Sequence, residues 1–67
     1  SLVAARVLRR GQVIGRQDVA IKRPGTGVPP EFLDIVVGSR ALRNINEDEP
    51  IGIYDFGTLN DDALNDK

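Results

Sequence analysis

The 67-residue sequence contains no cysteine and no histidine. Without cysteine it forms no disulfide and offers no thiolate to a metal ion. Without histidine it lacks the commonest general base and the commonest metal ligand, which excludes Ser-His and Cys-His nucleophilic pairs. We therefore expect no catalytic residue and no metal site in the chain, and the composition argues against an autonomous enzyme.

Aromatic residues and long apolar runs are also scarce. One tyrosine and two phenylalanines, with no tryptophan, leave few platforms on which bases can stack, so we expect no binding to nucleic acid. No stretch approaches the roughly 18 apolar residues that a membrane helix needs, and the first residues lack the apolar core of a secretory signal. We expect no membrane association, and the lack of cysteine fits a cytoplasmic location.

The formal net charge of −1 hides an uneven distribution. Residues 1–30 carry six basic side chains and one acidic side chain, whereas residues 31–67 carry nine acidic and three basic side chains. A basic half can mark a surface that binds phosphate or nucleic acid. Alternatively, the two halves interleave in the fold and their charges largely cancel.

Short apolar segments alternate with glycine- and proline-containing turns, which is typical of a β protein with very short strands. Gly11 is placed to adopt the positive φ of a tight turn. Pro30 suits the first position of a short helix, which Gly38 ends. We expect extended segments at residues 2–8, 20–23, 39–45 and 51–53.

An internal repeat appears when residues 1–19 are shifted by 37 places onto residues 38–56. Neither half is long enough to bury its apolar face alone, so we expect the halves to pack on each other about a pseudo-twofold axis. Asp18 and Asp55, which the repeat pairs, suit capping or turn roles rather than catalysis. Arg6 and Arg43 are paired in the same way and suit structural roles. The identical pairs are Ala4 and Ala41, Arg6 and Arg43, Ile14 and Ile51, Gly15 and Gly52, and Asp18 and Asp55.

The proline-glycine segment at residues 22–28, Lys-Arg-Pro-Gly-Thr-Gly-Val, is the most specific part of a wider resemblance. Together with residues 1–6, 11–14 and 38–45, it resembles the C-terminal antifreeze-like domain, or SAF domain, of the sialic acid synthases. The resemblance implies a mostly β, compact β-clip fold of the type III antifreeze kind, with short strands and one-turn helices. We expect the domain to span residues 1–58, followed by a disordered acidic tail at 59–67.

The resemblance also implies a function for a larger protein. Sialic acid synthases join this domain to a (β/α)8 barrel, which holds Mn²⁺ or Mg²⁺ and condenses phosphoenolpyruvate with N-acetylmannosamine, or a related amino sugar, to a nine-carbon ulosonic acid and phosphate. In their domain-swapped homodimer, this domain covers the barrel mouth of the partner chain. An arginine of the domain approaches the N-acetyl group of the sugar, and the matching residue is Arg23. Pro24, Gly25, Thr26 and Gly27 support its loop.

Other interpretations of these residues remain open. Spacing alone would make Arg23 a solvated cation beside a structural turn. The alternative function is the SAF domain of a periplasmic flagellar or pilus assembly protein, which has no need of Arg23. Type III antifreeze proteins share the implied fold and bind ice through a flat face. Ice binding is disfavoured for this chain, because Arg6 and Arg16 would place mobile cations on the matching face. We expect Lys22 to face solvent on the side opposite Arg23. Residues 47–49 lack the spacing of a calcium loop and are expected to form a solvated acidic turn.

Overall fold

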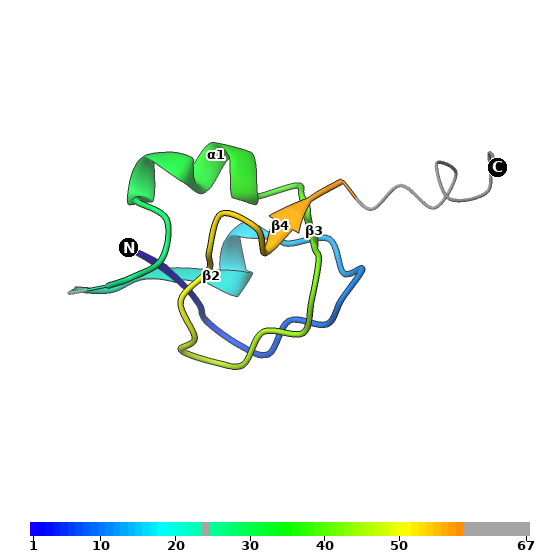
Figure 1. Cartoon of the computed structure of the whole chain (residues 1–67), viewed down its shortest axis with the longest axis horizontal. Helices are drawn as coiled ribbons and strands as arrows, with labels where there is room; N and C mark the ends of the chain where they lie inside the picture. Colours follow the sequence, from blue (N-terminus) through cyan, green and yellow to red (C-terminus); the bar gives the residue numbers. More distant parts are fainter. Residues whose placement is uncertain (24, 59–67) are drawn as a thin grey trace, which may run out of the picture.

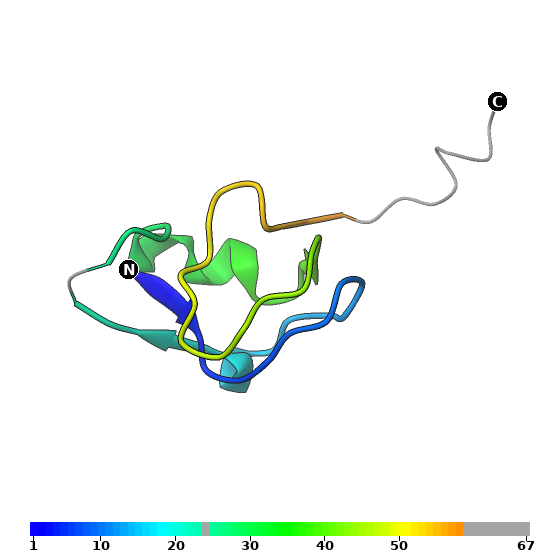
Figure 2. The same cartoon turned by 60° about the horizontal axis from the view of Figure 1, so that its bottom comes forward.

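Among the described residues, the strands form two separate two-stranded antiparallel sheets. In the computed structural model, which describes residues 1–23 and 25–58, β1 (Leu2–Ala4) pairs with β2 (Val19–Ile21), and β3 (Arg40–Ala41) pairs with β4 (Phe56–Gly57). Long loops connect these elements, as Figures 1 and 2 show. The architecture is the small, mostly β fold with short strands that the repeat and the resemblance predict.

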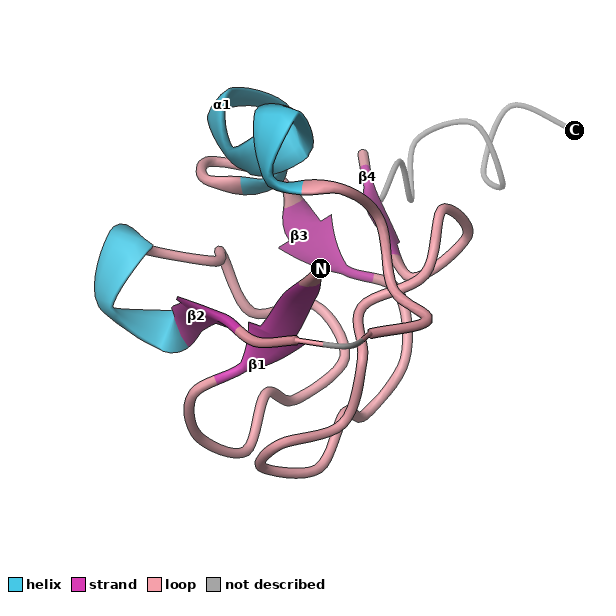
Figure 3. Ribbon diagram, turned by 90° about the vertical axis from the view of Figure 1, so that its left-hand side faces the viewer, coloured by secondary structure: helices cyan, strands magenta, loops and turns pink. Residues whose placement is uncertain are grey.

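Three short helical segments complete the fold: η1 (Arg16–Asp18), η2 (Pro30–Phe32) and α1 (Leu33–Val36). Pro30 opens η2, as expected, because its fixed φ suits the first helical position and it has no N–H to leave unpaired. The chain leaves α1 through Gly38, whose φ of 95° is open to glycine at little cost. In Figure 3, α1 lies above β3, on the side of the molecule away from the pair β1–β2.

The backbone hydrogen bonds confirm the pseudo-twofold relation that the 37-residue repeat predicts. Leu8 and Ile45, which are related by the repeat, exchange both of their backbone hydrogen bonds at 2.8 Å. Each half also contains a turn that corresponds to one in the other half, since Gly11 and Asp48 both have positive φ, 90° and 69°. Two further pairs of bonds are related by the repeat. The Gly11 N–H donates to Ala41 O and the Asp48 N–H donates to Ala4 O, both at 2.7 Å. The Ala41 N–H donates to Gln12 O at 2.9 Å, and the Ala4 N–H donates to Glu49 O at 3.0 Å.

The core lies between the two halves and draws on both of them. Four of its fully buried side chains are two repeat pairs, Leu8 with Ile45 and Ile14 with Ile51. Removing side chains of this size from water is worth roughly 1.5–3 kcal/mol each, so each half depends on the other for its stability. The buried apolar cluster consists of Leu2, Ala4, Leu8, Ile14, Val19, Val28, Val36, Ala41, Ile45, Ile51 and Phe56.

The strands are shorter than the sequence suggests, and one lies elsewhere. The segments expected at 2–8 and 39–45 form strands only in β1 and β3, and residues 51–53 form none. Conversely, β4 was not expected. The physical reason is that the chain changes partner every few residues: Leu2 pairs with Ile21, whereas Leu8 already bridges to Ile45 in the other half. Apolar content marks where the chain is buried but not which neighbour it meets.

Candidate functional site

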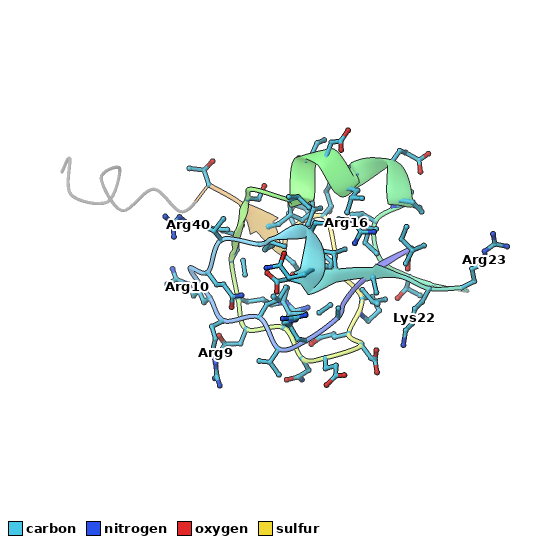
Figure 4. All side chains as sticks on the ribbon, turned by 180° about the vertical axis from the view of Figure 1, so that it is seen from behind. Arg9, Arg10, Arg16, Lys22, Arg23 and Arg40 are labelled. Atoms are coloured by element: carbon cyan, nitrogen blue, oxygen red, sulfur yellow. The ribbon has the colours of Figure 1, made fainter. Side chains whose placement is uncertain are left out.

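The loop that follows β2 carries Arg23 out from the body of the molecule. In Figure 4 the Arg23 side chain lies at the outer end of this loop and points away from the ribbon, while Lys22 points in a different direction. Both side chains are exposed. Pro24, which was expected to stiffen the loop, lies outside the described residues, as does the expected acidic tail at 59–67.

Both ends of this loop are held by backbone hydrogen bonds. At the start, Lys22 and Ser1 exchange bonds of 2.9 Å and 2.7 Å, which extend the pairing of β1 with β2. At the end, the Val28 N–H donates to Ile51 O at 2.8 Å, and the Leu2 N–H donates to Val28 O at 2.9 Å. The loop therefore leaves and re-enters the fold at two fixed points, on either side of β1.

Gly27 stands where the loop passes close to the backbone of both halves. A Cβ at this position would lie 2.6 Å from Leu2 O and 2.8 Å from Ile51 O. At Gly25, an added Cβ would overlap the Ser1 side chain. Within this domain the two glycines let the loop pack closely against Ser1 and β1.

An open hollow of about 300 Å³ lies at the base of the loop. Its floor includes the apolar residues Val3 and Pro50, which bridge the two halves as an isolated β-pair. Charged side chains of both signs stand around it, because Arg23 and Lys22 come from the loop and Asp48 comes from the turn of the second half. Gly25 and Thr26 complete the lining. The hollow combines a small apolar surface with hydrogen-bond donors and acceptors.

A direct ion pair crosses the rim of this hollow. Lys22 Nζ lies 2.7 Å from Asp48 Oδ1, and both side chains remain more than half exposed. Lys22 faces solvent, as expected, and it also pairs with Asp48. The repeat contained one signal that sequence reasoning missed. It aligns Asp48 with Gly11, so an acidic side chain stands at a turn position that favours glycine.

The repeated aspartates act as caps, as expected. Asp18 Oδ2 accepts the Gly15 N–H at 2.8 Å, and Asp55 Oδ2 accepts the Gly52 N–H at 2.7 Å. Asp18 is buried and lies 3.5 Å from the guanidinium of Arg6. Both carboxylates are fully used by the backbone and by an arginine, so neither is placed to act as an acid or a base.

Arg43 binds two carboxylates at once, unlike its repeat partner. Its guanidinium contacts Asp55 and Glu49, each at 2.8 Å. Hydrogen bonding to Arg43 is the main cause that lowers the pKa of Asp55 and of Glu49, and the same bonds raise the pKa of Arg43. These groups stay charged at neutral pH, so Arg43 has the structural role that the repeat suggested.

A family model described as the SAF domain matches residues 1–56. The chain belongs to the SAF domain family. This membership agrees with the small β fold, the two related halves and the loop that crosses between them. The resemblance drawn from residues 22–28 is thus confirmed at the level of the family.

Two relatives of this SAF domain are much longer proteins. It is 37% identical over 46 residues to the N,N'-diacetyllegionaminic acid synthase of Legionella pneumophila, which covers 69% of the chain and 13% of that synthase. It is 31% identical over 55 residues to an uncharacterized protein of Methanocaldococcus jannaschii, which covers 82% of the chain and 16% of that protein. No solved structure matches the chain. The SAF domain thus spans less than a fifth of the length of these relatives.

Basic side chains gather at the end of the SAF domain opposite Arg23. Figure 4 shows Arg9, Arg10 and Arg40 together there, and the Arg40 guanidinium donates to Gly11 O at 2.6 Å. Of the four ion pairs among residues 1–23 and 25–58, only Lys22–Asp48 joins the basic half to the acidic half. Direct ion pairing between the two halves is thus limited to this one contact among the described residues.

The described part of the chain carries neither a metal-binding cluster nor a membrane-spanning helix. Its acidic side chains form no group of three or more that is arranged to hold a metal ion. None of its helices is long and apolar enough to cross a membrane. Among the described residues, the loop with Arg23 and the hollow beside it is therefore the feature that best fits a recognition site.

Proposed function

We propose that this SAF domain is the C-terminal recognition and lid domain of a sialic acid synthase. The parent enzyme condenses phosphoenolpyruvate, water and N-acetylmannosamine, or a related N-acylated amino sugar, to a nine-carbon ulosonic acid and phosphate. The identity shared with an N,N'-diacetyllegionaminic acid synthase supports this class of reaction. The proposal places the enzyme in the cytoplasm and assigns its Mn²⁺ or Mg²⁺ to the barrel, outside this chain.

The observation that carries the proposal is the exposed Arg23 at the outer end of an anchored loop. A guanidinium presents five N–H donors in a fixed plane, so it suits an amide carbonyl together with neighbouring hydroxyl groups. In the proposed homodimer, the domain of one chain covers the barrel mouth of its partner. Arg23 then donates to the N-acyl carbonyl of the amino sugar bound there.

The loop is suited to this role because most of its path is set before any docking occurs. Its ends are fixed through Ser1 and Ile51, and Gly27 packs it against the backbone. A segment that is ordered before it binds loses less entropy on binding. Covering the barrel mouth would also exclude water and orient the sugar toward phosphoenolpyruvate. The domain thus contributes binding and closure, while the reacting groups belong to the barrel.

The test is steady-state phosphate release by the full-length protein, with phosphoenolpyruvate and an N-acylated amino sugar as substrates. A hydrogen bond from a charged group is worth roughly 1.5–3 kcal/mol, so Arg23→Ala should lower kcat/KM by about tenfold to a hundredfold. Arg9→Ala is the matched control, because it removes an exposed arginine at the opposite end of the domain. It should leave the rate unchanged.

A second substrate tests which group of the sugar Arg23 contacts. If Arg23 binds the acyl carbonyl, the Arg23→Ala substitution should reduce the preference for N-acetylmannosamine over mannosamine, which has no acyl group. An equal loss on both sugars would contradict that contact. An active enzyme that is indifferent to Arg23→Ala would remove the role assigned to Arg23. Inactivity on every N-acylated amino sugar would instead favour a SAF domain in an export or assembly protein.

A further inference from the structure

Asp48 adopts a backbone conformation for which its repeat partner uses glycine. The φ angles are 69° at Asp48 and 90° at Gly11, and both residues occupy the same place in their turns. Each donates its N–H across the molecule at 2.7 Å, to Ala4 and Ala41 respectively. A residue with a Cβ is strained at positive φ, whereas glycine is not. The turn by itself therefore favours glycine at both positions, and aspartate adopts this region more readily than most residues with a Cβ. At position 48 the turn thus carries a carboxylate where the related turn carries no side chain.

Lys22 pairs with this carboxylate. Its Nζ lies 2.7 Å from Asp48 Oδ1, and the two residues are 26 positions apart in the sequence. The side chains are 53% and 61% exposed, so the pair adds little to global stability. Its location matters more than its strength, because Lys22 directly precedes Arg23 and both partners line the hollow beside the loop.

We propose that Asp48 is a positioning residue, which holds Lys22 and thereby fixes the direction in which Arg23 projects. The Lys22 backbone is already bound to Ser1, and the ion pair fixes the side on which the Lys22 side chain lies. Arg23 directly follows Lys22 and lines the same hollow, so a Lys22 held through both its backbone and its side chain limits the directions in which the Arg23 side chain leaves the loop. A guanidinium with a preset direction loses less entropy when it meets its ligand.

The ion pair can be tested without reference to any enzymatic activity. Trypsin cleaves after Lys22 only when this side chain leaves Asp48 and enters the protease. In the full-length protein, Asp48→Gly should therefore speed cleavage of the Lys22–Arg23 bond by about two- to fivefold, as expected for loss of an exposed ion pair. Asp48→Asn keeps a polar partner for Lys22, so its cleavage rate should lie between those of the original protein and Asp48→Gly. Glu47→Gln is the matched control, because it removes the neighbouring negative charge and should leave the cleavage rate unchanged.

Asp48→Gly should fold normally, because glycine already occupies the related turn at position 11. An unchanged cleavage rate, or equal acceleration by Glu47→Gln, would overturn the role of Asp48 in holding Lys22. The cleavage is read from the masses of the two fragments, so it reports on this bond alone.

The effect on Arg23 rests on the proposed function and needs the enzymatic assay. Asp48→Gly should raise KM for the amino sugar by about two- to fivefold and leave kcat and the KM for phosphoenolpyruvate unchanged, because it weakens binding before and during the reaction alike. Lys22→Gln should have the same effect. The double variant should be no worse than either single variant, since both remove one interaction. A merely structural role would not produce this pattern.

The two experiments fail in different ways. Faster cleavage with an unchanged KM for the sugar would show that the ion pair orders Lys22 but does not position Arg23, which would refute the proposal. A full-length protein without synthase activity would refute the proposed function and the role in sugar binding. The cleavage assay would still decide whether Asp48 holds Lys22.

Discussion

Gly27→Ala tests how closely the crossing loop packs on both halves of the domain. The added Cβ would lie 2.6 Å from Leu2 O, 2.8 Å from Ile51 O and 3.0 Å from Ile51 N. All three are backbone atoms of fully buried residues, and the Ile51 N–H donates to Leu2 O at 3.0 Å. The methyl group would thus sit over a hydrogen bond that joins the first half to the second. No flexible side chain is present to move aside.

The size of the effect follows from two opposing contributions. Forcing one extra methyl group into a packed site costs roughly 1–3 kcal/mol. Replacing glycine by alanine recovers roughly 0.4–1 kcal/mol, because the unfolded chain has less freedom to lose. The expected net loss in the free energy of unfolding is about 1–2 kcal/mol. In a domain of this size each kcal/mol shifts Tm by roughly 4–8 °C, so Tm should fall by about 5–15 °C.

Thermal unfolding followed by far-UV circular dichroism measures this change. Gly57→Ala is the matched control, because its Cβ would meet only the Leu42 side chain, at an ordinary contact distance of 3.4 Å. That variant should be as stable as the original chain or slightly more stable. The reasoning is refuted if Gly27→Ala unfolds at the same temperature as Gly57→Ala.

Two further substitutions test the turn after α1 and the ion pairs of Arg43. Gly38→Ala should lower the free energy of unfolding by roughly 1–2 kcal/mol through its φ of 95° alone, since an added Cβ would have nothing within 4 Å. Gly38→Asn should lower it by less in the same unfolding assay. Equal stability of all three proteins would contradict this. Arg43→Gln should lower Tm at neutral pH but by less in acid, where Asp55 becomes protonated. Because Arg43 lowers the pKa of Asp55, its stabilisation is present above the unfolded-state pKa and is lost as pH falls through the folded-state value. Arg10→Gln is the control, and a pH-independent loss in Arg43→Gln would rule out this cause.

Several elements of the fold follow from local chemistry and could be predicted. Gly11 has the positive φ expected of it. Pro30 begins a helical segment and Gly38 follows the end of the short helix, as expected. The spacing of 37 between Asp18 and Asp55 indicated two related halves before any contact was known, and both residues cap a turn. These features depend on the backbone preferences of single residues, or on a repeated pattern of them, and both are written in the sequence.

The strand partners and the surroundings of Arg23 required the tertiary structure. The sequence by itself determined that the chain is a small two-part β domain with a proline-glycine segment between its halves, because turn residues and apolar spacing carry that information. Only the packed structure decided that Leu8 pairs with Ile45, that β4 exists, and that Lys22 reaches Asp48 across the hollow. Contacts between distant residues depend on how the halves meet in space, and no local preference specifies that geometry.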